Sequence, residues 1–126
     1  MQVWLIGFDD EDLELVEDVL AGCELVAFVS MMDAAMSDVR PDAIVFDVGG
    51  LGYCSGEAPD VCREVARVVD GHESAAIFVW SCVMAWSGDV LAHVRERSGV
   101  GHIAQLPEEH VRWPAIMRAH GLEIGE

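Results

Sequence analysis

The chain contains no lysine: its seven basic residues are all arginines, against 23 acidic residues and a net charge of −16. A surface this acidic repels the phosphate backbone of nucleic acids and the anionic leaflets of membranes. The composition therefore argues against direct nucleic-acid binding and against membrane association. It suits a basic protein partner, a divalent cation or a high-salt environment, and it does not choose among the three.

Cysteine and histidine patterns typical of metal or redox sites are also missing. The four cysteines form no C-x-x-C pair, and we expect them to be buried thiols. The five histidines lack metal-ligand spacing, so we expect them at the surface or at element edges. The opening run MQVWLIGF has no basic flank or cleavage site and is too short to span a bilayer. We therefore expect a cytoplasmic protein.

Short apolar runs alternate with amphipathic stretches along the whole chain. With 126 residues, 52% of them hydrophobic, residues 1–126 should form one domain around a single core. Strands are predicted at 3–8, 24–30, 43–47, 75–83 and 101–107. Helices are predicted from residue 9 to a C-cap at Gly22, at 31–39, at 59–69, at 87–97 with Ser87 as N-cap, and after residue 108, where Pro114 either starts the helix near Trp113 or kinks it.

Five strands with few charges, alternating with helices, predict an α/β fold with a parallel sheet covered on both faces. In such doubly wound folds, sites form at the carboxyl ends of the strands, where the strand order reverses. Asp47 ends the third predicted strand, Asp9 and Asp10 follow the first, and Ser81 lies near the end of the fourth. We therefore expect these four side chains to meet at one edge of the sheet.

This layout resembles the response-regulator receiver domain (CheY-like) over essentially the whole chain. RPDAIVFD (40–47) is similar to that family's third strand, which ends in the phosphoacceptor aspartate. DDE (9–11) resembles its acidic metal-binding pair. IFVWSC (77–82) resembles its fourth strand, with Ser81 where the family has a threonine or serine. GVGHIAQLP (99–107) is similar to the run into a fifth strand that ends in Lys-Pro.

The resemblance implies a flavodoxin-like fold with a five-stranded parallel sheet, (βα)5, in three layers. It also implies roles for the residues at the sheet edge. Asp47 would be the phosphoacceptor, Ser81 would hydrogen-bond the phosphoryl group, and Asp9, Asp10 and Asp47 would hold a weakly bound Mg²⁺.

The chain departs from the family at several of these positions. Leu106 stands where the family has its lysine, Ile103 stands at the aromatic switch position, and Leu51 replaces the proline expected after Asp47. The register of the acidic pair is also open. Alignment on charge gives Asp9 and Asp10, whereas alignment on the apolar face of the first helix gives residues 7 and 8, or 8 and 9.

The missing lysine has an electrostatic consequence. Carboxylates that lie close together without a fixed positive charge destabilise one another's ionised forms, so at least one of the three should have a raised pKa. Loss of the ammonium removes on the order of 2–4 kcal/mol of transition-state stabilisation, roughly 10²–10³ in the rate of phosphoryl transfer. Phosphorylation of Asp47 should therefore be slow.

The favoured interpretation is a pseudo-receiver of two-component or phosphorelay signalling, which acts through protein contacts and has weak or absent phosphoacceptor activity. It is no enzyme beyond self-phosphorylation and dephosphorylation at Asp47. One alternative is a functional Mg²⁺-dependent response regulator, and another is an unrelated small α/β enzyme or nucleotide-binding protein. The loop GGLGYCSG (49–56) lacks the lysine and hydroxyl of a phosphate-binding loop, so we interpret it as a turn.

The expected partner is a histidine kinase or a downstream effector. The resemblance places the contact surface on the fourth helix, the fifth strand and the last helix, which could also form a homodimer. Aromatic and arginine side chains are common interface anchors, and this surface is expected to include His102, Gln105, Arg112 and Trp113.

Overall fold

A computed structural model describes residues 1–28, 34, 37, 40–51, 58–72, 74–98 and 103–122. The described residues form one five-stranded sheet in which every neighbouring pair of strands is parallel. The strands are β1 (Gln2–Ile6), β2 (Glu24–Phe28), β3 (Ala43–Asp47), β4 (Ala76–Trp80) and β5 (Ile103–Gln105). Their order is β2-β1-β3-β4-β5, so the direction of winding reverses between β1 and β3.

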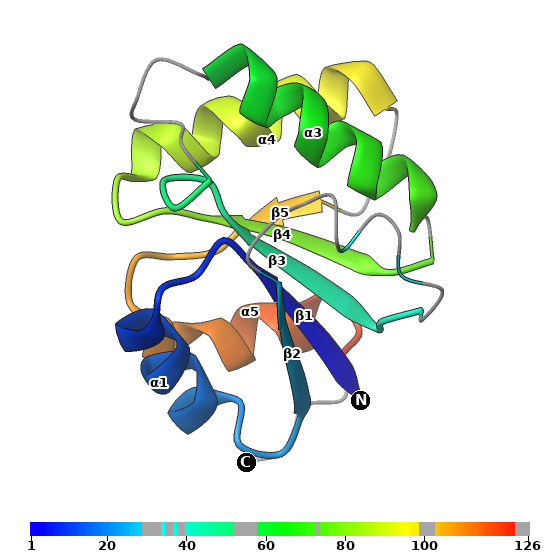
Figure 1. The fold of residues 1–126 in the computed structure, drawn as a ribbon. Coiled ribbons are helices and arrows are strands. Elements are labelled where there is room, and N and C mark those ends of the chain that lie inside the picture. The colour runs from blue at the N-terminus through cyan, green and yellow to red at the C-terminus, as the bar shows by residue number, and fades with distance from the viewer. Residues whose placement is uncertain are drawn as a thin grey trace.

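Helices cover both faces of this sheet and make three layers (Figure 1). The helices are α1 (Asp10–Val19), α3 (Ala58–Gly71), α4 (Met84–Ser98), the short 3₁₀ helix η2 (His110–Arg112) and α5 (Trp113–Ala119). Helices α3 and α4 lie on one face of the sheet, and α1 and α5 lie on the other. The predicted parallel sheet between helical layers is confirmed. The helix predicted at 31–39 lies largely outside the described residues, which contain four α-helices.

The sheet separates two apolar clusters, one on each face. Phe46, Ile77 and Val65 belong to the cluster beneath α3 and α4, and Val45 and Trp113 belong to the cluster beneath α1 and α5. Every residue of β3 is buried, as a continuous apolar run in a parallel sheet predicts. None of the described helices combines the length and the apolar character needed to cross a bilayer.

Three helix ends were predicted at named residues, and the structure places two of them elsewhere. Helix α1 ends at Val19 with Leu20 as its C-cap, so the C-cap predicted at Gly22 is wrong. Helix α4 begins at Met84, and the N-cap predicted at Ser87 is also wrong, because its buried hydroxyl donates to the carbonyl of Met84 at 3.1 Å. Helix α5 begins at Trp113, with Pro114 in its first turn, where a missing amide donor does no harm.

Candidate functional site

The predicted residues lie at the carboxyl edge of the sheet, where the strand order reverses. Asp47 is the last residue of β3 and pairs with Trp80 of β4. Asp9 follows β1 and caps α1, and Ser81 directly follows β4. The topology therefore brings Asp9, Asp47 and Ser81 to the same edge, although the contacts there differ from those of an open acidic pocket.

Asp47 is a buried carboxyl group, with only 6% of the residue exposed. Burial raises its pKa to about 6, and the negative charges of Asp12 and Asp9 act in the same direction. Backbone amides of Gly50 and Gly49 oppose this shift, and the Gly50 amide donates to Oδ1 at 3.1 Å. The prediction that at least one of these acids has a raised pKa is confirmed. The largest cause is loss of solvent, and charge repulsion is secondary.

Asp9 is the N-cap of α1, and this role engages one of its carboxylate oxygens. Its Oδ1 accepts a hydrogen bond from the backbone amide of Asp12 at 2.8 Å. Burial and the charge of Asp9 raise the pKa of the Asp12 carboxyl, which in turn acts on Asp47. Asp10 is exposed in the first turn of the helix. The two acids whose negative charges raise the pKa of Asp47 are therefore Asp9 and Asp12.

Asp12 was not among the residues singled out in the sequence. The signal for it is present, because an N-cap acid followed three residues later by a second acid is a common arrangement at helix starts. It could be used only once Asp9 was known to be the cap. A cap one residue earlier would place Glu11 at that position, and a cap one residue later would place Leu13 there.

The cap and the charge of Asp9 can be separated by mutation. Asp9→Ala removes both and should lower the free energy of unfolding by about 1 kcal/mol, the usual cost of a lost N-cap. Asp9→Ser keeps a capping oxygen and should lower it by much less. Urea denaturation of both variants measures the difference. An equal loss in both variants would show that the capping hydrogen bond is not the stabilising interaction.

Ser81 is fully buried, and its hydroxyl is already engaged. Its Oγ accepts a hydrogen bond from the amide of Val83 at 3.1 Å, just before α4 begins. A Cβ atom built on Gly49 would lie 3.5 Å from this oxygen, so Ser81 is adjacent to the turn that follows Asp47. The hydroxyl thus lies beside the turn that follows Asp47 and orients the entry into α4.

Leu106 is fully buried in the cluster beneath α1 and α5. Its amide donates to the carbonyl of Val79 at 2.9 Å, which places it beside Trp80 on the edge of the sheet. Trp80 pairs with Asp47 on its other side. Residue 80 of β4 therefore stands between Asp47 and the position where the family has its lysine. Ile103 is also buried, in the cluster on the opposite face.

Four rings pack together at this edge. Phe8 stacks on Trp80 with ring centroids 5.6 Å apart, and His110 lies 4.8 Å from both Trp80 and Trp113. Trp113 donates from its indole nitrogen to the carbonyl of Pro107 at 3.0 Å, which fixes η2 and α5 against the end of β5. Aromatic side chains therefore fill the part of this edge that lies between Trp80 and α5.

His110 faces the acidic residues from this aromatic cluster. Its Nε2 lies 3.8 Å from Oδ1 of Asp12 and is buried without a hydrogen-bond partner. Burial lowers the pKa of the imidazole, and the charge of Asp12 partly offsets this effect. The histidines were expected at the surface or at element edges: His110 is the half-buried first residue of η2, and His72 directly follows α3, where it is buried against Trp4 with ring centroids 4.9 Å apart. No spacing in the sequence marks either one.

The predicted Mg²⁺ ligands are partly engaged within the protein. Asp9 and Asp47 each accept a hydrogen bond from a backbone amide on one carboxylate oxygen. Within the described ranges, no three His, Cys, Asp or Glu side chains are placed to hold a metal ion together. Asp10, the third predicted ligand, is exposed. Because Mg²⁺ often binds one or two carboxylates and completes its coordination shell with water, weak Mg²⁺ binding at this edge stays a prediction.

The comparisons with known proteins give no identification. No model of a known protein family matches the chain, and no curated protein sequence matches it. The geometry of the sheet edge is therefore the basis for assigning a function.

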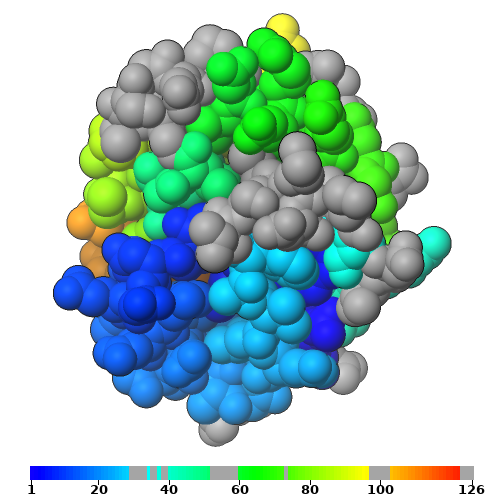
Figure 2. Space-filling model, viewed as in Figure 1, coloured from blue at the N-terminus to red at the C-terminus, as the bar shows by residue number. Residues whose placement is uncertain are grey.

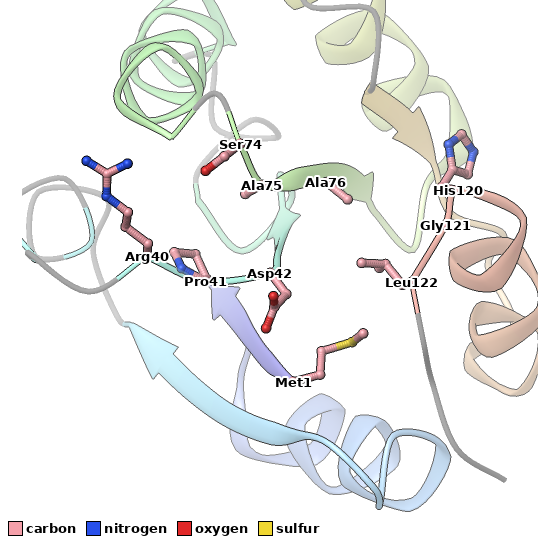
Figure 3. A pocket seen from close by; sticks show the side chains of 10 residues that line it. All are labelled: Met1, Arg40, Pro41, Asp42, Ser74, Ala75, Ala76, His120, Gly121 and Leu122. Atoms are coloured by element: carbon pink, nitrogen blue, oxygen red, sulfur yellow. The ribbon is translucent and has the colours of Figure 1, made fainter.

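A large hollow lies at the opposite, amino end of the sheet (Figure 3). Its volume is about 840 Å³, and its lining includes Arg40, Asp42 and His120. Asp42 accepts a hydrogen bond from the amide of Gln2 at 2.8 Å, and the guanidinium of Arg40 points away from it. The hollow is remote from Asp47, and its charged groups do not converge on one point.

The predicted docking surface needs correction at one position. Trp113 is fully buried in the core, so the prediction that it anchors a partner is wrong. Gln105 is half-buried and donates to the carbonyl of Met84 at 2.9 Å and to Ser87 at 2.8 Å. Arg112 is exposed and lies 3.6 Å from Glu109. His102 lies outside the described residues.

Proposed function

We propose that the chain is a receiver-like signalling module that acts through protein contacts and has weak or absent phosphoacceptor activity at Asp47. The strand order β2-β1-β3-β4-β5 supports this proposal, because it is the order of flavodoxin-like doubly wound folds, which bind at the point where the order reverses. An aspartate ends the central strand at that point. Two-component or phosphorelay signalling in the cytoplasm is the setting that this interpretation implies.

The proposal depends mainly on the environment of Asp47. Side-chain charges that act on it come from Asp12 and Asp9, and both are negative. Leu106 stands at the position of the family's lysine, and its buried side chain carries no charge. Trp80 lies between Leu106 and Asp47. A phosphoryl group on Asp47 would add negative charge with no ammonium to balance it. The fold is thus kept while the group that stabilises phosphoryl transfer is replaced.

Phosphorylation can be measured directly. The protein is incubated with acetyl phosphate and Mg²⁺, and intact mass reports the phosphoryl group. We expect little or no gain of mass, with a rate roughly 10²–10³ lower than that of a receiver that carries the lysine. Asp47→Asn serves as the control for the site. Rapid, stoichiometric phosphorylation that Asp47→Asn abolishes would contradict the proposal.

The main alternative is a functional phosphoacceptor response regulator. The meeting of Asp47, Asp9 and Ser81 at one edge favours it, because those groups match the family's acceptor, acidic pair and hydroxyl. The phosphorylation experiment decides between the two. A nucleotide or flavin that copurified with the protein would instead indicate an unrelated α/β enzyme or nucleotide-binding protein.

Without an enzymatic reaction of its own, the module would act on a protein partner, either a histidine kinase or a downstream effector. A homodimer through β5 and α5 belongs to the same proposal. Light scattering over a range of protein concentrations tests it, and a mass that stays monomeric throughout would remove the homodimer.

A further inference from the structure

The turn after β3 folds back over the carboxylate of Asp47. Gly50 donates its amide to Oδ1 of Asp47 at 3.1 Å, and Leu51 donates its amide to the carbonyl oxygen of Asp47 at 3.0 Å. The green-cyan surface of this segment lies beside the blue surface of the β1–α1 segment in Figure 2. Asp47 is the side chain that this turn covers, which explains why it is only 6% exposed.

A close contact between the backbones of Gly50 and Gly7 determines how near the turn lies to the β1–α1 segment. A Cβ atom built on Gly50 would overlap the carbonyl oxygen of Gly7 and would lie 3.1 Å from Oδ2 of Asp47. The backbone of residue 50 therefore rests directly on Gly7 and on the second carboxylate oxygen. No side chain larger than hydrogen fits between them.

Leu51 closes the contact from the side. A Cβ atom on Gly7 would lie 2.7 Å from Cγ of Leu51, so the leucine side chain covers the bare backbone of Gly7. Gly7 has φ +87, a conformation that glycine adopts without strain. On the opposite side, a Cβ atom on Gly49 would lie 3.4 Å from the ring of Trp86. The turn is thus held between Gly7 and α4.

We propose that Gly49–Leu51 is a lid over Asp47, latched where Leu51 covers Gly7, and that a ligand reaches the carboxylate only when the lid opens. The closed turn uses one carboxylate oxygen as an acceptor and covers the other. A cation, a phosphoryl donor or any other small electrophile must displace it. Opening breaks the hydrogen bonds that the amides of the turn donate to Asp47, among them those of Gly50 and Leu51, and uncovers one half-buried leucine, which is far less than global unfolding requires.

Two variants disturb the packing of the turn against Gly7 in different ways. Leu51→Ala removes the side chain that covers Gly7, and Gly50→Ala inserts a methyl group against the Gly7 carbonyl. Leu15→Ala is the control, because Leu15 is 49% exposed on α1, outside the turn. Two readouts are used in the intact protein: hydrogen exchange of the amides of residues 49–51, and amidation of Asp47 by a carbodiimide with glycinamide, located by peptide mass.

In the two latch variants we expect amide exchange at least tenfold faster and amidation of Asp47 several-fold faster, with no change in Leu15→Ala. Circular dichroism verifies the fold, and Leu51→Ala carries the test if Gly50→Ala does not fold. Unchanged exchange and amidation in folded Leu51→Ala would overturn the lid. Neither readout requires phosphorylation. Faster exchange and amidation without any phosphoryl gain would therefore support the lid and the proposed function together, whereas rapid phosphorylation would contradict only the latter.

Discussion

Replacing Asp47 by asparagine is expected to raise the free energy of unfolding at pH 7 by about 2–3 kcal/mol. The pKa of this carboxyl rises from 3.8 to about 6 in the folded protein, and each unit corresponds to about 1.4 kcal/mol. At pH 7 the folded state must therefore hold a buried negative charge that the unfolded chain exposes to water. Asparagine keeps the oxygen that accepts from Gly50 and removes the charge.

The raised pKa of Asp47 also determines the direction in which the stability of the protein changes with pH. Between pH 3.8 and 6 the folded protein binds a proton at Asp47 that the unfolded chain has released, so Asp47 lowers stability as the pH rises through this range. Urea denaturation at about pH 4, 5, 6 and 7 should show this slope in the wild type and lose that part of it in Asp47→Asn. Glu14→Gln, an equal change of charge at an exposed site of α1, is the control. An Asp47→Asn variant less stable than the wild type at pH 7 would contradict the prediction.

Introducing the missing ammonium by Leu106→Lys is expected to destabilise the protein by about 3–5 kcal/mol at pH 7. Leu106 is fully buried in an apolar cluster, and Trp80 of the intervening strand lies between it and Asp47, so we expect the new ammonium to be buried among apolar side chains without a partner. Leu106→Met, which keeps the volume and adds no charge, should cost less than about 1.5 kcal/mol.

Chemical denaturation measures both variants at position 106. The loss in Leu106→Lys should shrink at high pH, where the amine can be buried in its neutral form. A lysine variant as stable as the wild type, together with a lowered pKa at Asp47, would show that the ammonium reaches the carboxylate. That result would contradict the separating role assigned to Trp80.

The architecture could be predicted because it depends on pattern. The run AIVFD at 43–47 is apolar with no alternation, and such runs are typical of parallel strands buried on both faces, as β3 is. Two helix boundaries were missed because they depend on local choices between residues of similar propensity. Ser87 has the chemistry of an N-cap, yet it bonds back to Met84 inside a helix that begins earlier.

The candidate site could be predicted only in part, because strand ends locate residues but not their contacts. Asp47, Asp9 and Ser81 reach one edge as the topology requires. Asp12 depends on the turn at which α1 starts, and His110 depends on how η2 packs against two tryptophans. The turn over Asp47 depends on a contact between residues 7 and 50, which are distant in sequence. Such a contact leaves no periodic signal.

The proposed function depends on Asp47 being a buried acid that faces other acids and no cation. A carbon-13 NMR titration of its side-chain carboxyl, assigned by comparison with Asp47→Asn, measures this directly. The structure predicts a midpoint near pH 6, because burial raises the pKa to about 6. A midpoint at or below the ordinary value of 3.8 would mean that a positive charge or free solvent reaches the carboxylate, and it would contradict the proposed environment of Asp47.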